Sequence, residues 1–136
     1  MEQVAARRGF WWVLLVLIIS AGLLSRLVNT GFRLSDKYLG DALYAAMVYV
    51  LFRLTGRIPR PALCAALAMT AIECFQLTRI PAALLRSEHI ALRACARLLG
   101  TEFSFLDMLA YAVGIACLAA IDPTVRVPVH RGAHRS

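Results

Sequence analysis

The sequence lacks most of the motifs that mark a catalytic or metal-binding domain. It contains no nucleophile–base arrangement, no metal-ligand spacing and no internal repeat, so we expect no metal and no other cofactor. Its four cysteines are widely separated and form no C-x-x-C pair, which argues against a disulfide framework and favours a role as small apolar side chains. These are Cys64, Cys74, Cys95 and Cys117.

Acidic residues and lysine are also scarce. The chain has 15 Lys+Arg against 8 Asp+Glu, giving a net charge of +7, and Lys37 is its single lysine. Such a charge would suggest a nucleic-acid partner in a soluble protein, but no nucleic-acid-binding motif accompanies it. The arginines lie mostly in joints between apolar segments, where they contact lipid phosphates. We therefore expect membrane lipids as partners, no nucleic acid, and we leave a homo-oligomer open.

Apolar side chains are in excess. Hydrophobic residues make up 60% of the chain and the mean hydropathy is +0.69, against roughly 45–50% apolar residues in a soluble domain. A soluble protein of this length has too little interior to bury so much apolar surface, whereas a bilayer solvates it. We predict an all-α fold in which residues 1–123 form a single transmembrane helical bundle. Residues 124–136 are expected to form a basic, disordered tail.

The apolar segments predict about four transmembrane helices. The first, residues 10–28, is longer than the ~7–15 apolar residues of a signal peptide and spans roughly 28 Å, close to the ~30 Å hydrocarbon core. The others are residues 38–54, 61–77 and 103–121, the last stopped by Asp122-Pro123. The uninterrupted apolar part of 38–54 is shorter than a typical span.

An amphipathic helix is expected between the last two spans. Within residues 83–99, Leu85, Leu92 and Leu99 recur at heptad spacing with arginines offset from them, which predicts a helix lying in the membrane interface. Gly100 is expected to end it. With four crossings, the termini share the face that collects more arginines, so both termini are predicted to be cytoplasmic.

Polar side chains interrupt the apolar segments at one depth. An ionisable residue inside a membrane helix costs at least ~2.5–3.5 kcal/mol, so it marks a candidate site. Counting along the helices places these groups in the half of the bilayer away from the termini. They are Arg26, Asp41, Glu73, Gln76 and Asp107, with Tyr44 and Tyr111 one turn deeper than the two aspartates. We predict one polar cluster that opens toward the long connection.

Each member also has a purely structural explanation. Asp41 can stabilise the positive end of its helix, Asp107 can form a capping box with Ser104, and Arg26 can snorkel to the interface. The tyrosines can be packing residues with satisfied hydroxyls. Glu73 is mid-helix and is expected to cap nothing, so its structural explanation is an ion pair with Arg26.

The polar positions resemble those of the VanZ-like family of small bacterial membrane proteins. That family has an I-E-x-x-Q helix, a following arginine and a D-x-x-x-N-x-x-G motif. The matching positions are Ile72, Glu73, Gln76, Arg86, Asp107, Tyr111 and Gly114, with Tyr111 in place of the usual Asn. Further matches at 22–26, 38–41 and 99–103 are closer to an uncharacterised sister family. The resemblance covers nearly the whole chain, from the first helix to Gly114.

The resemblance implies a multi-pass bacterial inner-membrane protein with an envelope-related role, because VanZ-like proteins are associated with reduced sensitivity to teicoplanin. Our leading hypothesis is a non-enzymatic protein that binds a lipid or amphiphile head group at the cluster. Arg26 would pair with a phosphate or carboxylate, and Gln76 and Tyr111 would supply hydrogen bonds.

Two other functions are open. A membrane-embedded enzyme acting on an isoprenoid or lipid could use Glu73 and Asp107 as paired acid and base. A proton-coupled transporter could relay protons through the same acids, although four short helices would need to dimerise for that purpose.

Overall fold

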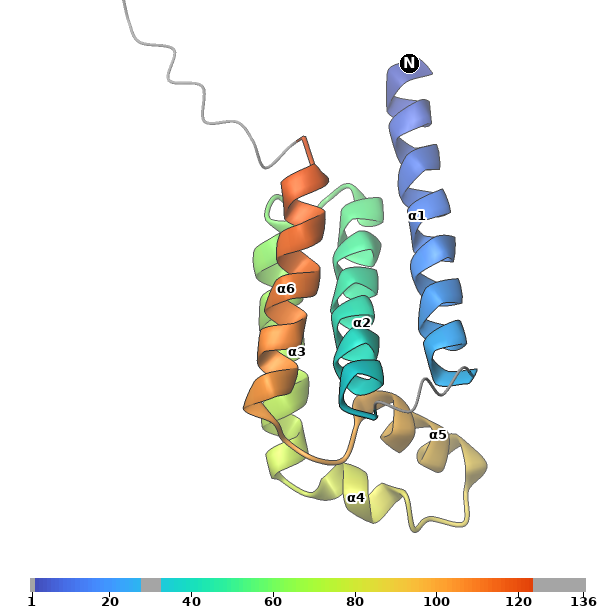
Figure 1. The fold of residues 1–136 in the computed structure, drawn as a ribbon, viewed down its shortest axis with the longest axis vertical. Helices are drawn as coiled ribbons and strands as arrows, with labels where there is room; N and C mark the ends of the chain where they lie inside the picture. Colours follow the sequence, from blue (N-terminus) through green and yellow to red (C-terminus); the bar gives the residue numbers. More distant parts are fainter. Residues whose placement is uncertain (1, 28–32, 124–136) are drawn as a thin grey trace, which may run out of the picture.

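The computed structural model describes residues 2–27 and 33–123, and the predicted tail 124–136 lies outside this range. The described chain contains six α-helices and no strand, which confirms the all-α prediction (Figure 1). The helices are α1 (Glu2–Leu27), α2 (Arg33–Thr55), α3 (Pro61–Leu77), α4 (Ile80–Leu84), α5 (Ile90–Leu99) and α6 (Phe105–Ile121).

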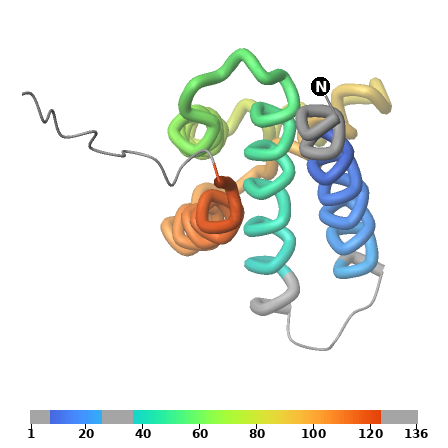
Figure 2. Tube along the Cα trace, turned by 90° about the horizontal axis from the view of Figure 1, so that it is seen from above, coloured from blue at the N-terminus to red at the C-terminus, as the bar shows by residue number. Residues whose placement is uncertain are grey.

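Helix α2 lies at the centre of the bundle. It packs against α6 and α3 on one side and against α1 on the other, as Figures 1 and 2 show from two directions. The short helices α4 and α5 lie at the end of the bundle opposite the N-terminus. The beginning of α2, the end of α3 and the beginning of α6 therefore meet at the end that α4 and α5 occupy.

The helix boundaries follow the apolar segments with extensions into polar sequence. Helix α3 covers the predicted residues 61–77, with Pro61 in its first turn. Helices α1 and α2 begin earlier than predicted, at Glu2 and Arg33, because hydropathy detects the apolar part of a helix and not its polar turns. Helix α6 begins at Phe105, after Ser104 in extended conformation.

The prediction of an amphipathic helix within residues 83–99 is confirmed for α5, Ile90–Leu99, but its predicted extent was wrong because residues 85–89 are not helical. The segment breaks between α4 and α5, where the Ser87 hydroxyl oxygen accepts the backbone N–H of His89 at 3.2 Å. A side chain that bonds the local backbone in this way competes with helix formation. The predicted end at Gly100 is confirmed: its φ of +78° is readily adopted only by glycine.

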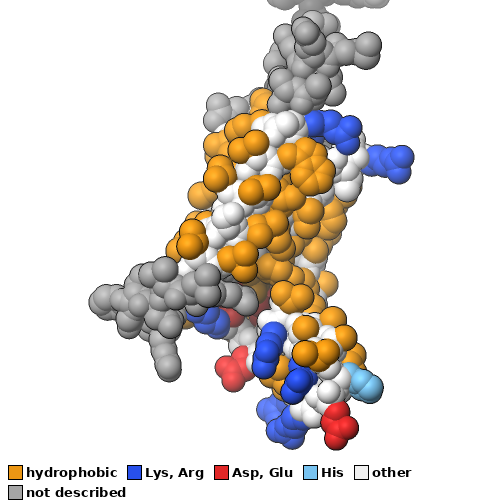
Figure 3. Space-filling view, turned by 90° about the vertical axis from the view of Figure 1, so that its right-hand side faces the viewer, with side chains coloured by type: hydrophobic (Ala, Val, Ile, Leu, Met, Phe, Trp, Pro, Cys, Tyr) orange, Lys and Arg blue, Asp and Glu red, His pale blue; other side chains and the backbone are white. Residues whose placement is uncertain are grey.

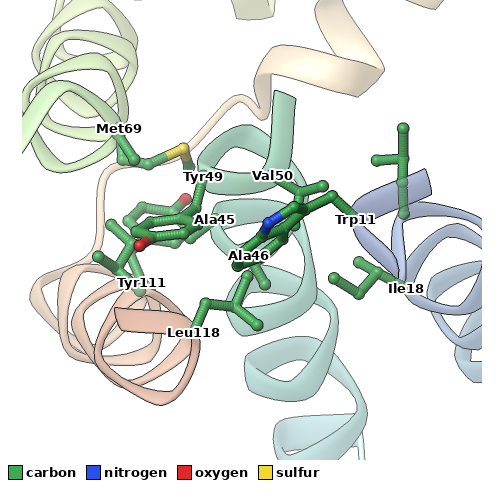
Figure 4. Packing of buried hydrophobic residues seen from close by; sticks show 12 residues of the cluster. Trp11, Ile18, Ala45, Ala46, Tyr49, Val50, Met69, Tyr111 and Leu118 are labelled. Atoms are coloured by element: carbon green, nitrogen blue, oxygen red, sulfur yellow. The ribbon is translucent and has the colours of Figure 1, made fainter. Parts of the chain in front are cut away.

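The core is built around α2 and is rich in aromatic rings (Figure 4). Tyr49 is fully buried between Trp11 of α1 and Met69 of α3, and its ring centroid lies 6.2 Å from that of Trp11. Gly114 brings α6 against α2, because a Cβ atom at this position would overlap the backbone carbonyl of Ala42. Small residues permit this close helix contact.

Large apolar side chains cover the outside of the long helices. The segment Arg8–Ser25 of α1 is long and apolar enough to cross a membrane, and only 17% of it is buried. Helices α3 and α6 are apolar but shorter. Among the described helices, α1 alone is both long and apolar enough to cross a membrane by length and composition. Figure 3 shows hydrophobic side chains over the middle of one face and charged side chains toward both ends. Membrane association is thus supported by one candidate span.

Candidate functional site

Five of the seven predicted cluster residues line one cavity of about 270 Å³, which we call the polar cavity. It lies where α2 and α6 begin and where α3 and α5 end. The predicted residues that line it are Asp41, Tyr44, Gln76, Asp107 and Tyr111; Lys37, Gly40 and residues 97–102 complete the lining. These five residues were selected by counting helix turns, and they are up to 70 positions apart in the chain, from Asp41 to Tyr111.

Asp107 is only 3% exposed and joins α6 to α2. Its Oδ2 atom forms an ion pair with Lys37 Nζ at 2.9 Å, while Oδ1 is buried with no hydrogen-bond partner in the described part of the chain. The capping-box explanation was wrong, because Ser104 precedes α6 without a side-chain capping hydrogen bond. Asp107 thus lines the polar cavity and has one buried oxygen that no described group satisfies.

Lys37 was missed as a site residue because hydropathy placed it in a joint. Its Nζ atom lies 2.9 Å from Asp107 Oδ2, and its side chain is 47% exposed. Lys37 thus supplies the positive charge that Asp107 pairs with at the polar cavity. In the sequence, Lys37 differs from the other basic residues only in being the single lysine.

Glu73 lies behind the polar cavity and does not line it. It is fully buried; Oε1 accepts the Tyr111 hydroxyl at 2.6 Å and Oε2 accepts the backbone N–H of Ser104 at 3.3 Å. The prediction that Glu73 caps nothing was wrong. In a capping box, the Asp107 side chain would accept the backbone N–H of Ser104, the N-cap residue of α6. Glu73 accepts this N–H instead, from the neighbouring helix α3. The predicted pair with Arg26 cannot be placed, because the Arg26 side chain lies outside the described residues.

Gln76 joins the end of α3 to the end of α5. Its Nε2 donates to the backbone carbonyl of Leu99 at 2.6 Å, and its Oε1 is buried without a hydrogen-bond partner among the described residues. A buried polar atom without a partner costs about 1–3 kcal/mol. Gln76 and Asp107 both line the polar cavity, and each has one buried acceptor atom without a hydrogen-bond partner in the described part of the chain.

A second cavity of about 230 Å³ adjoins the polar cavity, and we call it the apolar hollow. It lies between α1 and α2 and shares three lining residues with the polar cavity: Gly40, Tyr44 and Leu98. Its remaining lining is apolar: Ile18, Ile19, Gly22, Leu23, Leu43 and Met47. A polar space and an apolar space thus meet at Gly40 and Tyr44.

The opposite end of the bundle contains a buried charge that the sequence did not reveal. Asp122 is fully buried, and its Oδ2 accepts the Tyr49 hydroxyl and Arg53 Nε, each at 2.8 Å. The sequence predicts only that Asp122-Pro123 stops the last helix. A carboxylate at the C-terminus of a helix faces the negative end of the helix dipole, so its position could have indicated the need for a partner.

Comparison with known proteins identifies a family without assigning an activity. The chain matches no curated protein and no solved structure. Residues 30–115 match the family described as "Protein of unknown function (DUF2809)", a stretch that includes every residue lining the polar cavity. The predicted kinship with an uncharacterised family is confirmed, whereas nothing links the chain to VanZ specifically. The chain belongs to the uncharacterised DUF2809 family.

Proposed function

We propose that this protein binds an amphiphile in a membrane, with the head group in the polar cavity and the hydrocarbon chain in the apolar hollow. The observation that carries the proposal is the junction of the two spaces at Gly40, Tyr44 and Leu98. Small-molecule sites usually measure ~300–1,000 Å³ and combine apolar walls with a few polar groups. Neither space alone reaches that range, and the two together fall within it.

The proposal includes a multi-span arrangement, with α1, α2, α3 and α6 crossing the bilayer and α4 and α5 in one interface. Exposed large apolar residues occur on all four long helices, such as Val16, Leu51, Leu67 and Val113. Each of α3 and α6 has 17 residues, at the lower limit of the ~17–25 residues that span a bilayer. We place both termini in the cytoplasm of a bacterial inner membrane on the arginine distribution.

The chemistry of the polar cavity favours a head group with O–H or N–H donors. Its lining contains the carboxylates of Asp41, Glu102 and Asp107 and the cations Lys37 and Arg97. Carboxylates outnumber cations, and two buried acceptors on the lining residues have no protein donor in the described part of the chain. A head group with ammonium or hydroxyl donors suits this lining, whereas a head group of net negative charge would meet a surplus of negative charge.

The enzymatic alternative is less well supported by this geometry. Paired acid–base chemistry requires both carboxylates at one substrate. Asp107 lines the polar cavity, but Glu73 lies behind Tyr111 with each of its two oxygens in a hydrogen bond. We therefore retain binding as the proposed function, together with the envelope-related role that the VanZ-like resemblance implies.

The decisive variant is Gly40→Leu. A Cβ atom at Gly40 meets nothing within 4 Å, so a leucine there would extend into the junction of the two spaces. Gly9→Leu is the matched control, because Gly9 is equally uncrowded and lines none of the cavities described here. Native mass spectrometry would compare retention of phosphatidylethanolamine, phosphatidylcholine and an alkyl glucoside by the detergent-purified proteins.

We expect the wild type and Gly9→Leu to retain the ethanolamine lipid or the glucoside, which carry N–H or O–H donors, in preference to phosphatidylcholine, which has none. Gly40→Leu should lose this adduct while unfolding at no lower temperature than Gly9→Leu. Equal retention by Gly40→Leu and Gly9→Leu would refute the site, as would the absence of both adducts from the wild type.

The multi-span arrangement has a separate test. In a variant without the four native cysteines, Arg57→Cys and Ser87→Cys should react with an impermeant maleimide from opposite sides of the membrane. The four-span topology predicts that Arg57→Cys is labelled from the cytoplasm and Ser87→Cys from the periplasm. Labelling of both positions from one side would contradict it.

A further inference from the structure

A third cavity, of about 410 Å³, lies at the end of the bundle away from the polar cavity. We call it the basic pocket. It is lined by Arg8, Trp11, Arg53, Leu54, Thr55, Gly56 and Arg57, and thus by three guanidinium groups and no carboxylate. The proposed amphiphile site shares none of these residues and gives this pocket no role.

One arginine of the basic pocket is held in place by buried groups. Arg53 donates from Nε to the fully buried Asp122 at 2.8 Å, and its guanidinium lies 5.6 Å from the centre of the Trp11 ring. A guanidinium has five N–H donors in a planar fork, so a fork oriented through Nε presents its other donors in a fixed direction. Its side chain is 22% exposed. Arg53 is therefore positioned before any ligand arrives.

Among the described side chains, carboxylates balance only part of the positive charge of the basic pocket. Asp122 offsets one positive charge, that of Arg53. Arg8 and Arg57 form no ion pair with any carboxylate among the side chains that the structure describes, which are those of residues 8–25 and 37–123. Three arginines with one carboxylate leave a surplus of two positive charges around a space that can hold a small group. Arginine forks match the oxygens of phosphate in paired, charge-assisted hydrogen bonds.

In the proposed membrane arrangement, the basic pocket lies at the level of the lipid head groups. Arg8 begins the apolar segment Arg8–Ser25 of α1, and Arg53 and Arg57 flank the end of α2. We propose that the basic pocket binds a negatively charged phosphate group, as carried by an anionic phospholipid or by free phosphate. The three arginines hold its oxygens, and Asp122 and Trp11 position Arg53 for this contact.

The test compares two double variants of equal charge. Arg8→Gln/Arg57→Gln removes two exposed arginines of the basic pocket, and Arg79→Gln/Arg86→Gln removes two exposed arginines from the α4 end of the bundle. Native mass spectrometry would measure binding of phosphatidylglycerol and phosphatidylcholine to the full chain in detergent. A parallel titration with inorganic phosphate at constant ionic strength would follow Trp11 fluorescence in a Trp12→Phe background, where Trp11 is the single tryptophan.

We expect the wild type and Arg79→Gln/Arg86→Gln to bind phosphatidylglycerol in preference to phosphatidylcholine, and Arg8→Gln/Arg57→Gln to bind it about tenfold or more weakly. A fluorescence response to inorganic phosphate would show that the free anion suffices, and a response to phosphatidylglycerol alone would identify the lipid as the source. Equal binding by the two double variants would overturn the proposal, as would a wild type that binds neither probe.

Discussion

A buried aspartate lies near each end of α6, and α2 supplies a partner for both. Asp122, at the C-terminal end, is fully buried and accepts hydrogen bonds from Tyr49 and Arg53. Asp107, at the N-terminal end, is 3% exposed, pairs with Lys37 through one oxygen, and leaves the other without a hydrogen-bond partner in the described chain. The two carboxylates are similar in burial and differ in how completely the protein satisfies them.

This difference in hydrogen bonding indicates a structural role for Asp122 and a place in a candidate binding site for Asp107. A buried carboxylate with two well-placed donors holds helices together, and its loss leaves a partner charge unbalanced. A buried carboxylate with an unused acceptor beside a cavity is destabilising until a ligand donates to it. The surroundings agree with this distinction: Asp122 is hydrogen-bonded to Tyr49 of the hydrophobic core, whereas Asp107 lines the polar cavity.

The largest effect is expected from truncating each aspartate. Asp122→Ala should lower the free energy of unfolding by about 3–5 kcal/mol, because Arg53 and the Tyr49 hydroxyl lose their acceptor. Asp107→Ala should cost clearly less, since Lys37 is half exposed and can be solvated. Chemical unfolding in detergent, followed by circular dichroism, would measure both. Equal losses from the two variants would contradict the distinction.

The contact midway between the two aspartates is the next test. Gly114→Ala would drive a Cβ atom into the Ala42 carbonyl and separate α2 from α6, on which both ion pairs depend. We expect a loss of about 1–3 kcal/mol. Gly22→Ala is the control, because a Cβ at Gly22 meets nothing within 4 Å. If Gly114→Ala were as stable as Gly22→Ala in thermal unfolding, α6 would not pack against the Ala42 backbone as closely as described.

The two buried tyrosine hydroxyls should differ in the same way. Tyr111→Phe leaves the fully buried Glu73 with only the Ser104 N–H, so we expect a loss of about 1.5–3 kcal/mol. Tyr49→Phe leaves Asp122 with the Arg53 guanidinium and should cost about 0.5–1.5 kcal/mol. Chemical unfolding would measure the difference in unfolding free energy between the two variants. A larger loss for Tyr49→Phe would show that the Tyr111 hydroxyl is not needed to satisfy Glu73.

The smallest expected effect is a gain. Gly40→Ala places a methyl group in open space inside α2 and should raise the free energy of unfolding by roughly 0.5–1 kcal/mol, because alanine is favoured over glycine within a helix. Gly9→Ala should give a similar gain at a site away from the cavities. A loss at Gly40 in thermal unfolding would mean that the junction of the polar cavity and the apolar hollow is already filled.

The sequence was most informative where position along a helix determines depth. Asp41, Gln76 and Asp107 could be predicted to lie at one level because each interrupts an apolar helix at a countable distance from its end. The same method could not reveal which groups pair. Lys37 was assigned to a joint and Asp122 to a helix stop, because their partners lie on neighbouring helices, far away in the chain.

Local side-chain chemistry explains the other differences. Between α4 and α5 the chain follows local turn hydrogen bonds, among them that from the His89 N–H to the Ser87 hydroxyl oxygen, and heptad spacing does not detect these contacts. Glu73 caps α6 from a neighbouring helix, an arrangement that depends on how α3 and α6 pack. Tyr111 is the residue that reaches Glu73 from α6, and its hydroxyl donates to Glu73 Oε1 at 2.6 Å.

The most direct test of the central claim is lipid retention by Asp107→Asn, measured by native mass spectrometry beside its stability in detergent. If Asp107 belongs to a binding site, Asp107→Asn should unfold within about 1 kcal/mol of the wild type, as expected for an imperfectly satisfied buried charge, and should lose the amphiphile adduct. A variant that keeps the adduct at wild-type levels, or that unfolds as readily as Asp122→Ala, would show that both aspartates are structural.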